Sequence, residues 1–180
     1  MPGYKNATRI ARGLPNLGGV VTIDLFSEDD FLATTLEFPL ESAIATGEIT
    51  GTAFPTAAGF LGAARIKFDS TECKVDSEMV GGLGYQGFKH KFTGKMAGND
   101  KAQVLAVQSF RNRPAVCVAT MPDGTRQLLG TLLNPLTIKG NWTTGDANGE
   151  KQYEISGEME NPCAFTPPVI NATVIYTLLP

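Results

Sequence analysis

Charged residues are scarce in this sequence. They make up 18% of the 180 residues, whereas soluble domains typically carry about a quarter. The 15 Lys and Arg against 18 Asp and Glu leave a formal net charge of -3, so no basic surface argues for tight binding of nucleic acid. The hydrophobic fraction of 42% is ordinary, and a chain of this length can bury a substantial core. The composition therefore predicts a folded single domain with a sparsely charged surface.

Cysteine and histidine are also rare. The three cysteines are widely spaced, and the single histidine is His90, so the familiar zinc-ligand patterns are missing. The first residues hold no apolar segment of the kind that a secretory signal needs. We therefore expect a reducing compartment in which the thiols are buried and unpaired; they are Cys73, Cys117 and Cys163. No apolar run is long enough for a membrane-spanning helix, and we expect neither a metal, nor a cofactor, nor a membrane.

Motifs for catalysis are not visible either. His90 lies between Lys89 and Lys91 in an alternating segment, so we expect a solvated histidine whose pKa is lowered by the two lysines. The glycine-rich residues 81–87 match neither a P-loop nor a dinucleotide fingerprint and predict a bulge or a tight turn. Three acidic residues in or just after the last predicted strand could form a paired-carboxylate site, but they suit a solvated strand face better; they are Glu154, Glu158 and Glu160. We expect no enzyme.

Glycine and proline, by contrast, are plentiful, with 20 and 11 residues. They punctuate segments that are β-branched or alternate between apolar and polar residues, which is typical of strands. Asp123-Gly124 is a strong hairpin turn. Strands are expected at residues 20–26, 65–68, 83–92, 115–119, 126–130, 136–142 and 151–159. The fold class is predicted to be mainly β, an antiparallel β-sandwich or partly closed barrel.

One helix is predicted, at about residues 99–111. Asn99 or Asp100 caps it, and Pro114 follows its end. Its apolar face is assigned from the i, i+3, i+4, i+7 spacing, which selects Ala102, Leu105, Ala106 and Ser109.

Three parts of the chain are distinguished by composition. Residues 1–19 are expected to form an extended N-terminal arm, residues 20–160 a single β-rich domain, and residues 161–180 a C-terminal arm. Within the domain, residues 39–64 show no clean period although they are not short of apolar side chains. A loop of that length is usually functional, so we expect it to pack on something, and another copy of the chain is one candidate.

The few charges are segregated by sign along the chain. Residues 21–60 contain acidic residues and no basic ones, namely Asp24, Glu28, Asp29, Asp30, Glu37, Glu41 and Glu48. Residues 81–126 are mainly basic, with Lys89, Lys91, Lys95, Lys101, Arg111, Arg113 and Arg126. The two blocks either neutralise each other within one subunit or meet between copies, where complementary potentials fix the register. Repeated head-to-tail contact of that kind gives a ring or a filament.

The order of these elements resembles the major tail tube protein family of tailed bacteriophages. The resemblance covers about residues 20–160. It is carried by the valine-rich strand, the long loop, the helix at residues 99–110, the Asp123-Gly124 turn, the Leu128-Leu129-Gly130 segment, and the final hairpin around Asp146 and Gly149 with its "Y.I…G.M" pattern.

The resemblance implies rings, usually hexameric, that stack into a hollow tube through which DNA is ejected. Each subunit would add strands to a continuous lumenal barrel, residues 39–64 would reach into a neighbour, and an acidic lumen would let DNA slide without specific binding. Tape measure and terminator proteins would be partners, and the protein would be made in the host cytoplasm and end in the virion tail. Candidates for self-assembly or the lumen are Glu37, Glu41, Glu48, Lys89, Lys91, Arg111, Arg113, Glu154 and Glu158.

Two other classes stay open on the sequence alone. Another virion component, such as a capsid decoration or head–tail connector protein, would bind a preassembled shell and would not polymerise alone. A ligand- or carbohydrate-binding β-sandwich would need exposed aromatic side chains on one face, and Trp142 with Tyr153 is the pair that we would test.

Overall fold

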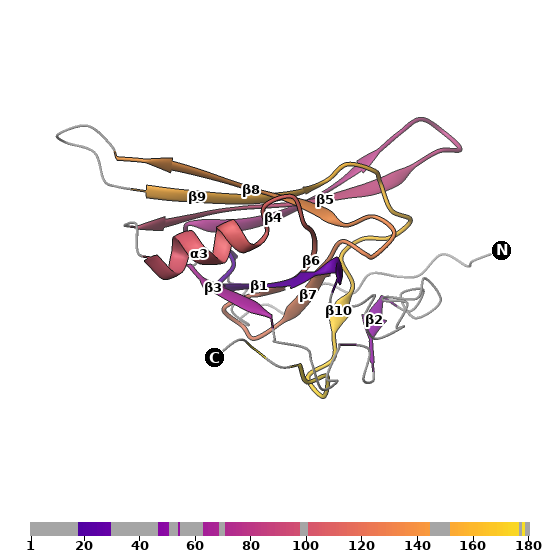
Figure 1. Ribbon diagram of the computed structural model, residues 1–180. Coiled ribbons are helices and arrows are strands. Elements are labelled where there is room, and N and C mark those ends of the chain that lie inside the picture. Colours follow the sequence, from indigo (N-terminus) through magenta and orange to yellow (C-terminus); the bar gives the residue numbers. More distant parts are fainter. Residues whose placement is uncertain are drawn as a thin grey trace.

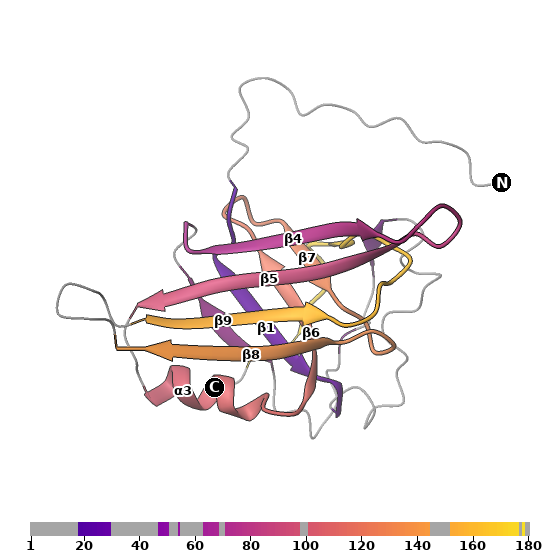
Figure 2. The ribbon, with the colours of Figure 1, turned by 90° about the horizontal axis from the view of Figure 1, so that it is seen from above.

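The computed structural model describes residues 18–29, 47–50, 54, 63–68, 71–97, 101–144, 152–176 and 178. Two crossing layers of strands make up most of this part of the chain (Figures 1 and 2). The four-stranded layer has the order β8-β9-β5-β4, and its strands are β4 (Cys73–Val80), β5 (Gly87–Ala97), β8 (Leu136–Thr143) and β9 (Gln152–Met159). Figure 2 shows these four strands side by side above the other layer.

The six-stranded layer lies beneath. It consists of β1 (Thr22–Ser27), β2 (Glu48–Ile49), β3 (Ala64–Lys67), β6 (Pro114–Thr120), β7 (Arg126–Leu129) and β10 (Val169–Ile170). The two layers are one hydrogen-bonded sheet, because β6 pairs with the first two residues of β8. Neighbouring strands are antiparallel except β10 and β2, which are parallel. The predicted mainly β fold is confirmed, as a mixed sheet that folds over on itself without closing into a barrel.

The core has two parts, one on each side of β1 and β6. Ile23 and Leu25 face the four-stranded layer and pack in a cluster that includes Phe92 and Ile155. Phe26, one position further along, points to the opposite side and packs in a second cluster, because successive side chains of a strand alternate between faces. A strand that is buried on both faces typically has a continuous apolar sequence. This explains the apolar sequence of β6.

The second core cluster is covered by two segments outside the predicted strands, namely parts of the predicted long loop and of the predicted C-terminal arm. Ile49 and Phe54, from the predicted long loop, are buried there, as are Ile170 and Val174 near the C-terminus. The described residues of the long loop therefore contribute to the core of their own subunit. The C-terminal segment likewise packs on the body and adds β10 to the edge of β7.

The helix α3 (Lys101–Ser109) confirms the predicted helix, but the predicted apolar face is wrong. Val107 is buried, as is Phe110 just past the helix end, whereas Leu105 is 52% exposed and Ser109 is exposed. Val107 packs against Gly140 of β8. Burial of Val107 and Phe110 removes more apolar surface from water than burial of the predicted face would, because that face holds two alanines and a serine besides Leu105. No helix in the described ranges is long and apolar enough to cross a membrane.

Candidate self-assembly surfaces

The face of the four-stranded layer that points away from the core is polar, and it is called the outer face below. Alternation along each strand brings these residues to it: Lys74, Asp76 and Glu78 of β4, Lys89, Lys91, Thr93 and Lys95 of β5, Glu154, Ser156 and Glu158 of β9, and Thr137, Lys139 and Asn141 of β8. The opposite face holds Phe92, Ile155 and Met159 against the core. A sheet with one solvated face shows this clean division.

Charges of opposite sign face each other across the strands of the outer face. Lys91 lies opposite Glu158, and Lys95 opposite Glu154. On the other side, Lys91 also lies opposite Asp76 of β4. Cross-strand pairs of opposite sign stabilise a sheet modestly. An ion pair on this face joins Lys74 Nζ to Asp76 Oδ2 at 3.0 Å, and both side chains are largely exposed.

Four of the candidate residues therefore lie together, on one face of neighbouring strands β5 and β9: Lys89, Lys91, Glu154 and Glu158. Lysines stand opposite the glutamates here, so this face is mixed in charge rather than acidic. Glu48 lies in the other layer, where it accepts a 2.7 Å hydrogen bond from Asn171. Arg111 and Arg113 are exposed after α3, and Glu37 and Glu41 lie outside the described residues.

Both side edges of the four-stranded layer are open over much of their length. Among the described strands, β4 pairs with β5 alone. On the other side, β8 pairs with β6 only at Leu136 and Thr137, so residues 138–142 face no described strand beyond β9. An open edge presents unpaired backbone groups that another chain can pair with, and charged side chains such as those of β4 protect such an edge against indiscriminate pairing.

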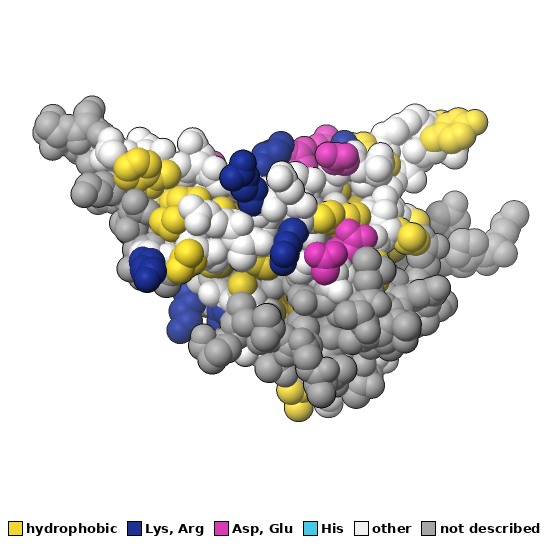
Figure 3. Space-filling view, viewed as in Figure 1, with side chains coloured by type: hydrophobic (Ala, Val, Ile, Leu, Met, Phe, Trp, Pro, Cys, Tyr) yellow, Lys and Arg dark blue, Asp and Glu magenta, His cyan; other side chains and the backbone are white. Residues whose placement is uncertain are grey.

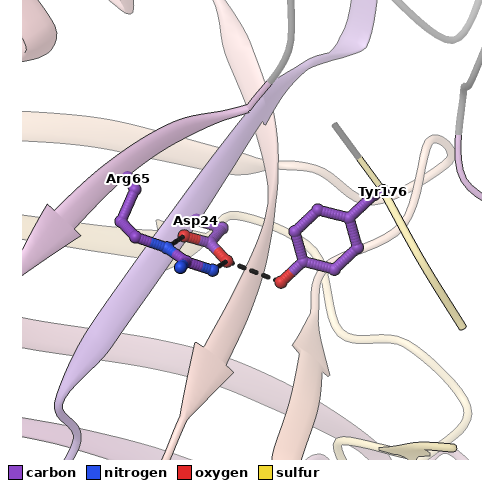
Figure 4. Close-up of polar contacts among 3 residues, drawn as sticks. All are labelled: Asp24, Arg65 and Tyr176. Atoms are coloured by element: carbon purple, nitrogen blue, oxygen red, sulfur yellow. Dashed lines mark hydrogen bonds and ion pairs between the residues drawn. The ribbon is translucent and has the colours of Figure 1, made fainter. Parts of the chain in front are cut away.

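A buried charge cluster holds the C-terminal segment to the six-stranded layer (Figure 4). Asp24 of β1 is fully buried. It accepts hydrogen bonds from Arg65 Nε and Nη2 at 2.6 and 2.7 Å, and from the Tyr176 hydroxyl at 2.5 Å. Arg126 of β7 donates to the carbonyls of Asn171 and Val174, at 2.6 and 3.0 Å. Charge-assisted bonds of this kind are about twice as strong as neutral ones.

Asp24, the first residue of the acidic block, is therefore buried and paired within its own subunit. Hydrogen bonds to Asp24 raise the pKa of the Arg65 guanidinium, and burial together with the Asp24 bond raises the pKa of Tyr176. Arg65 does not belong to the basic block of residues 81–126, so its ion pair with Asp24 is not a contact between the acidic block and the basic block. A signal was present in the sequence, because an isolated carboxylate within an apolar strand indicates a buried pair.

His90 is fully buried, which corrects the expected solvated position. Its Nδ1 accepts a hydrogen bond from the Gly130 amide at 3.3 Å, and its Nε2 lies 3.0 Å from the Phe165 carbonyl, so Nε2 carries the proton. Burial lowers the pKa of His90, while the Phe165 carbonyl raises it by less. The flanking lysines point to the opposite face and are not the cause.

The cysteines are all buried and free, as predicted. Cys163 Sγ lies 3.5 Å from His90 Nε2 and 3.2 Å from the Phe165 carbonyl. Burial raises the pKa of Cys73 to about 12 and also raises that of Cys117, so these thiols stay protonated and unreactive. Within the described ranges, no group of three His, Cys, Asp or Glu side chains could hold a metal ion.

A comparison with models of protein families found no match, and a search of curated proteins found none either. Among solved structures, a chain from the tail of an empty gene transfer agent (GTA) particle, refined with C6 symmetry, is 17% identical with a TM-score of 0.36. The match covers 52% of this chain and 78% of that chain. A chain from the virion of a native GTA particle is 18% identical with a TM-score of 0.35, and the match covers 52% of this chain and 80% of that one. At these TM-scores the likeness is partial, and the proposals below rest on the chain's own residues.

Proposed function

We propose that this chain is a virion structural protein that assembles into rings, and that the rings stack into the tube of a phage tail. The sequence resemblance suggests the family. The observation that carries the proposal is the four-stranded layer, which combines two open side edges with an outer face that is polar over its whole width. A sheet of this kind is completed when copies of the chain pair edge to edge.

The strand directions allow such a ring to close. The four strands alternate in direction, since β8, β9, β5 and β4 are antiparallel neighbours. A copy rotated about an axis roughly along the strands therefore places its β8 antiparallel to β4 of the first copy, which continues the alternation. Closure into a barrel removes the open edges, and β4 and residues 138–142 of β8 form the joint.

The position of the six-stranded layer then determines which face of the four strands lines the channel. The inner face of the four strands is covered by the six-stranded layer, so that layer lies outside the barrel and the outer face points to the lumen. Six copies would supply about 24 strands, more than the 16 to 18 of porins that already hold a water-filled channel. Lysines and glutamates in register give DNA phosphates no one-signed surface to bind, and tight binding to DNA needs clustered cations.

The two alternatives are less well supported. A decoration or connector protein has no need for two open edges on one polar sheet. A carbohydrate platform would need Trp142 and Tyr153 to present their rings together. The two residues are opposite each other on β8 and β9, but Tyr153 packs against the core cluster, which leaves Trp142 as the exposed member.

Engineered disulfides between copies test the joint directly. Asp76→Cys on β4 is combined in turn with Lys139→Cys, Asn141→Cys and Thr143→Cys on β8, all on the outer face. We expect one register to give covalent oligomers up to a closed ring under mild oxidation, as measured by denaturing electrophoresis.

Glu154→Cys on the central strand β9 is the matched control. In this control, Glu154→Cys takes the place of the β8 cysteine and is combined with Asp76→Cys. We expect it to give no covalent ring. A chain that stays uncrosslinked in every β4–β8 register, at concentrations where it forms rings, contradicts the proposed joint. A chain that forms no ring contradicts the function.

A further inference from the structure

We infer that the tip of the β4–β5 hairpin, residues 81–86, is a preformed apolar plug that seats on a second copy of this chain in the adjacent ring, beside Trp142. This inference rests on the proposed function, since it requires rings that stack. It assigns the ring-to-ring contact to a segment other than the long loop at residues 39–64.

The tip has a fixed backbone conformation. Gly81 and Gly84 have positive φ angles of 102° and 90°, a region that favours glycine. A Cβ added at Gly81 would clash with the Tyr85 carbonyl oxygen. The Tyr85 amide donates to the Gly82 carbonyl at 3.0 Å. These glycines confirm the tight turn predicted from the sequence and define where the side chains between them point.

The base of the hairpin is anchored as well. The amide of Phe88 donates to the Cys163 carbonyl at 2.7 Å, and the amide of Cys163 donates back to Phe88 at 2.9 Å. A Cβ at Gly87 would approach the Pro162 side chain to 2.8 Å, so the chain packs closely there. His90 ties the same strand to Phe165 and Gly130. This network gives the buried histidine a role, which is to hold a projecting hairpin in one direction.

Two large apolar side chains stand on that rigid tip almost completely in water. Leu83 is 96% exposed and Tyr85 87% exposed. Figure 3 shows hydrophobic side chains at the end of the projection where Figure 1 draws the hairpin. Single exposed apolar residues are ordinary, whereas two on a preformed projection mark a contact site.

The opposite end of the same four strands carries an apolar receptor. Since β8 runs parallel to β5 through β9, the hairpin tip at the start of β5 and Trp142 near the end of β8 lie at opposite ends of the layer. Trp142 is 47% exposed, and Leu105 of the nearby α3 is 52% exposed. In a ring whose axis follows the strands, one end faces the ring above and the other the ring below. Stacking therefore brings the tip of one copy to the Trp142 end of the next.

A pair of polar substitutions tests the plug. Leu83→Ser with Tyr85→Ser, in the full chain, is expected to give rings but lose tubes in negative-stain microscopy. Gly81→Ala, which keeps both apolar side chains but strains the turn, is expected to shorten the tubes. Ile175→Ser is the matched control, because Ile175 is 78% exposed on the six-stranded side, and it should form tubes as the unchanged chain does.

A crosslink identifies the receptor. Tyr85→Cys combined with Trp142→Cys and a short bis-maleimide is expected to give a covalent ladder in tubes, while each single variant gives dimers at most. Tubes of unchanged length from the Leu83→Ser, Tyr85→Ser chain, or tubes without the ladder, overturn the inference while leaving the function intact. Loss of rings as well as tubes in that variant also overturns it, because the tip would then act within the ring. An unchanged chain that never forms rings overturns the function itself.

Discussion

The two layers of this protein differ in what covers them. In the six-stranded layer, β1 and β6 are buried on both faces, by the four-stranded layer on one side and by residues such as Ile49, Phe54 and Val174 on the other. The four-stranded layer is covered on one face only, and among the described residues its other face is polar and its side edges are unpaired over much of their length. We therefore expect the stability of the subunit to depend mainly on the doubly covered strands, and the proposed assembly to depend on the four-stranded layer.

The largest effect on stability is expected in the doubly covered layer. Phe26→Ala removes a ring that contacts Phe54 at 5.2 Å and Tyr176 at 5.1 Å between centroids. We expect a loss of about 3–5 kcal/mol in the free energy of unfolding, measured by urea denaturation. A loss below about 1 kcal/mol, as for a surface change, would mean that the second core cluster does not stabilise the subunit.

The buried charge cluster should give the next largest effect. Arg65→Met leaves the fully buried Asp24 with the Tyr176 hydroxyl as its remaining described side-chain partner. Removal of one member of a fully buried pair costs about 3 kcal/mol; because Arg65 is 36% exposed, we expect a loss of at most about that size. Tyr176→Phe removes one bond to a charged group and should cost about 1.5–3 kcal/mol. The loss in the double variant should differ from the sum of the two, since both act on the same carboxylate. Full additivity in urea denaturation would contradict the shared cluster.

A smaller effect is expected from pH, through His90. Its pKa is lowered by burial, so the unfolded chain binds the proton more readily. Stability is complete above the unfolded pKa of about 6.5 and falls as the pH drops below it, by at most about 1.4 kcal/mol per pH unit. The loss levels off below the folded pKa. Urea denaturation between pH 5 and 8 measures this slope, and His90→Gln should reduce it; an equal slope in both chains would exclude His90 as its origin.

The smallest effect on stability is expected on the outer face. Lys91→Ala removes a charge opposite Glu158 and Asp76, and exposed pairs of this kind change the free energy of unfolding by less than about 1 kcal/mol. The same variant places a more acidic surface in the proposed lumen. A loss comparable to that of Phe26→Ala in the same denaturation assay would remove the distinction between the two layers.

Much of the fold follows from local patterns in the sequence. Continuous apolar runs predicted β1 and β6, the Asp123-Gly124 turn predicted the hairpin between β6 and β7, and alternation in residues 151–159 predicted the faces of β9. β4 was missed although Cys73, Val75 and Met79 alternate with charged residues, because its exposed edge carries so many polar side chains. The strand β5 also begins later than predicted, since residues 83–86 belong to the turn.

The misplaced residues share a physical cause, which is contact between distant parts of the chain. His90 is buried by Phe165 and Gly130, and Asp24 by Arg65 and Tyr176. The separation along the sequence between Asp24 and Tyr176 is 152 residues, so no local pattern records it. The four candidate residues Lys89, Lys91, Glu154 and Glu158 share a face because β5 pairs with β9, which a search for blocks of charge along the chain does not reveal.

Electron microscopy of the purified full chain over a range of concentrations tests the central claim most directly. Under the proposed function, we expect rings and stacked tubes in which β4 of one copy lies beside β8 of the next, with the outer face of the four-stranded layer toward the channel. A chain that stays strictly monomeric at high concentration, or tubes in which that face points outward, would contradict it.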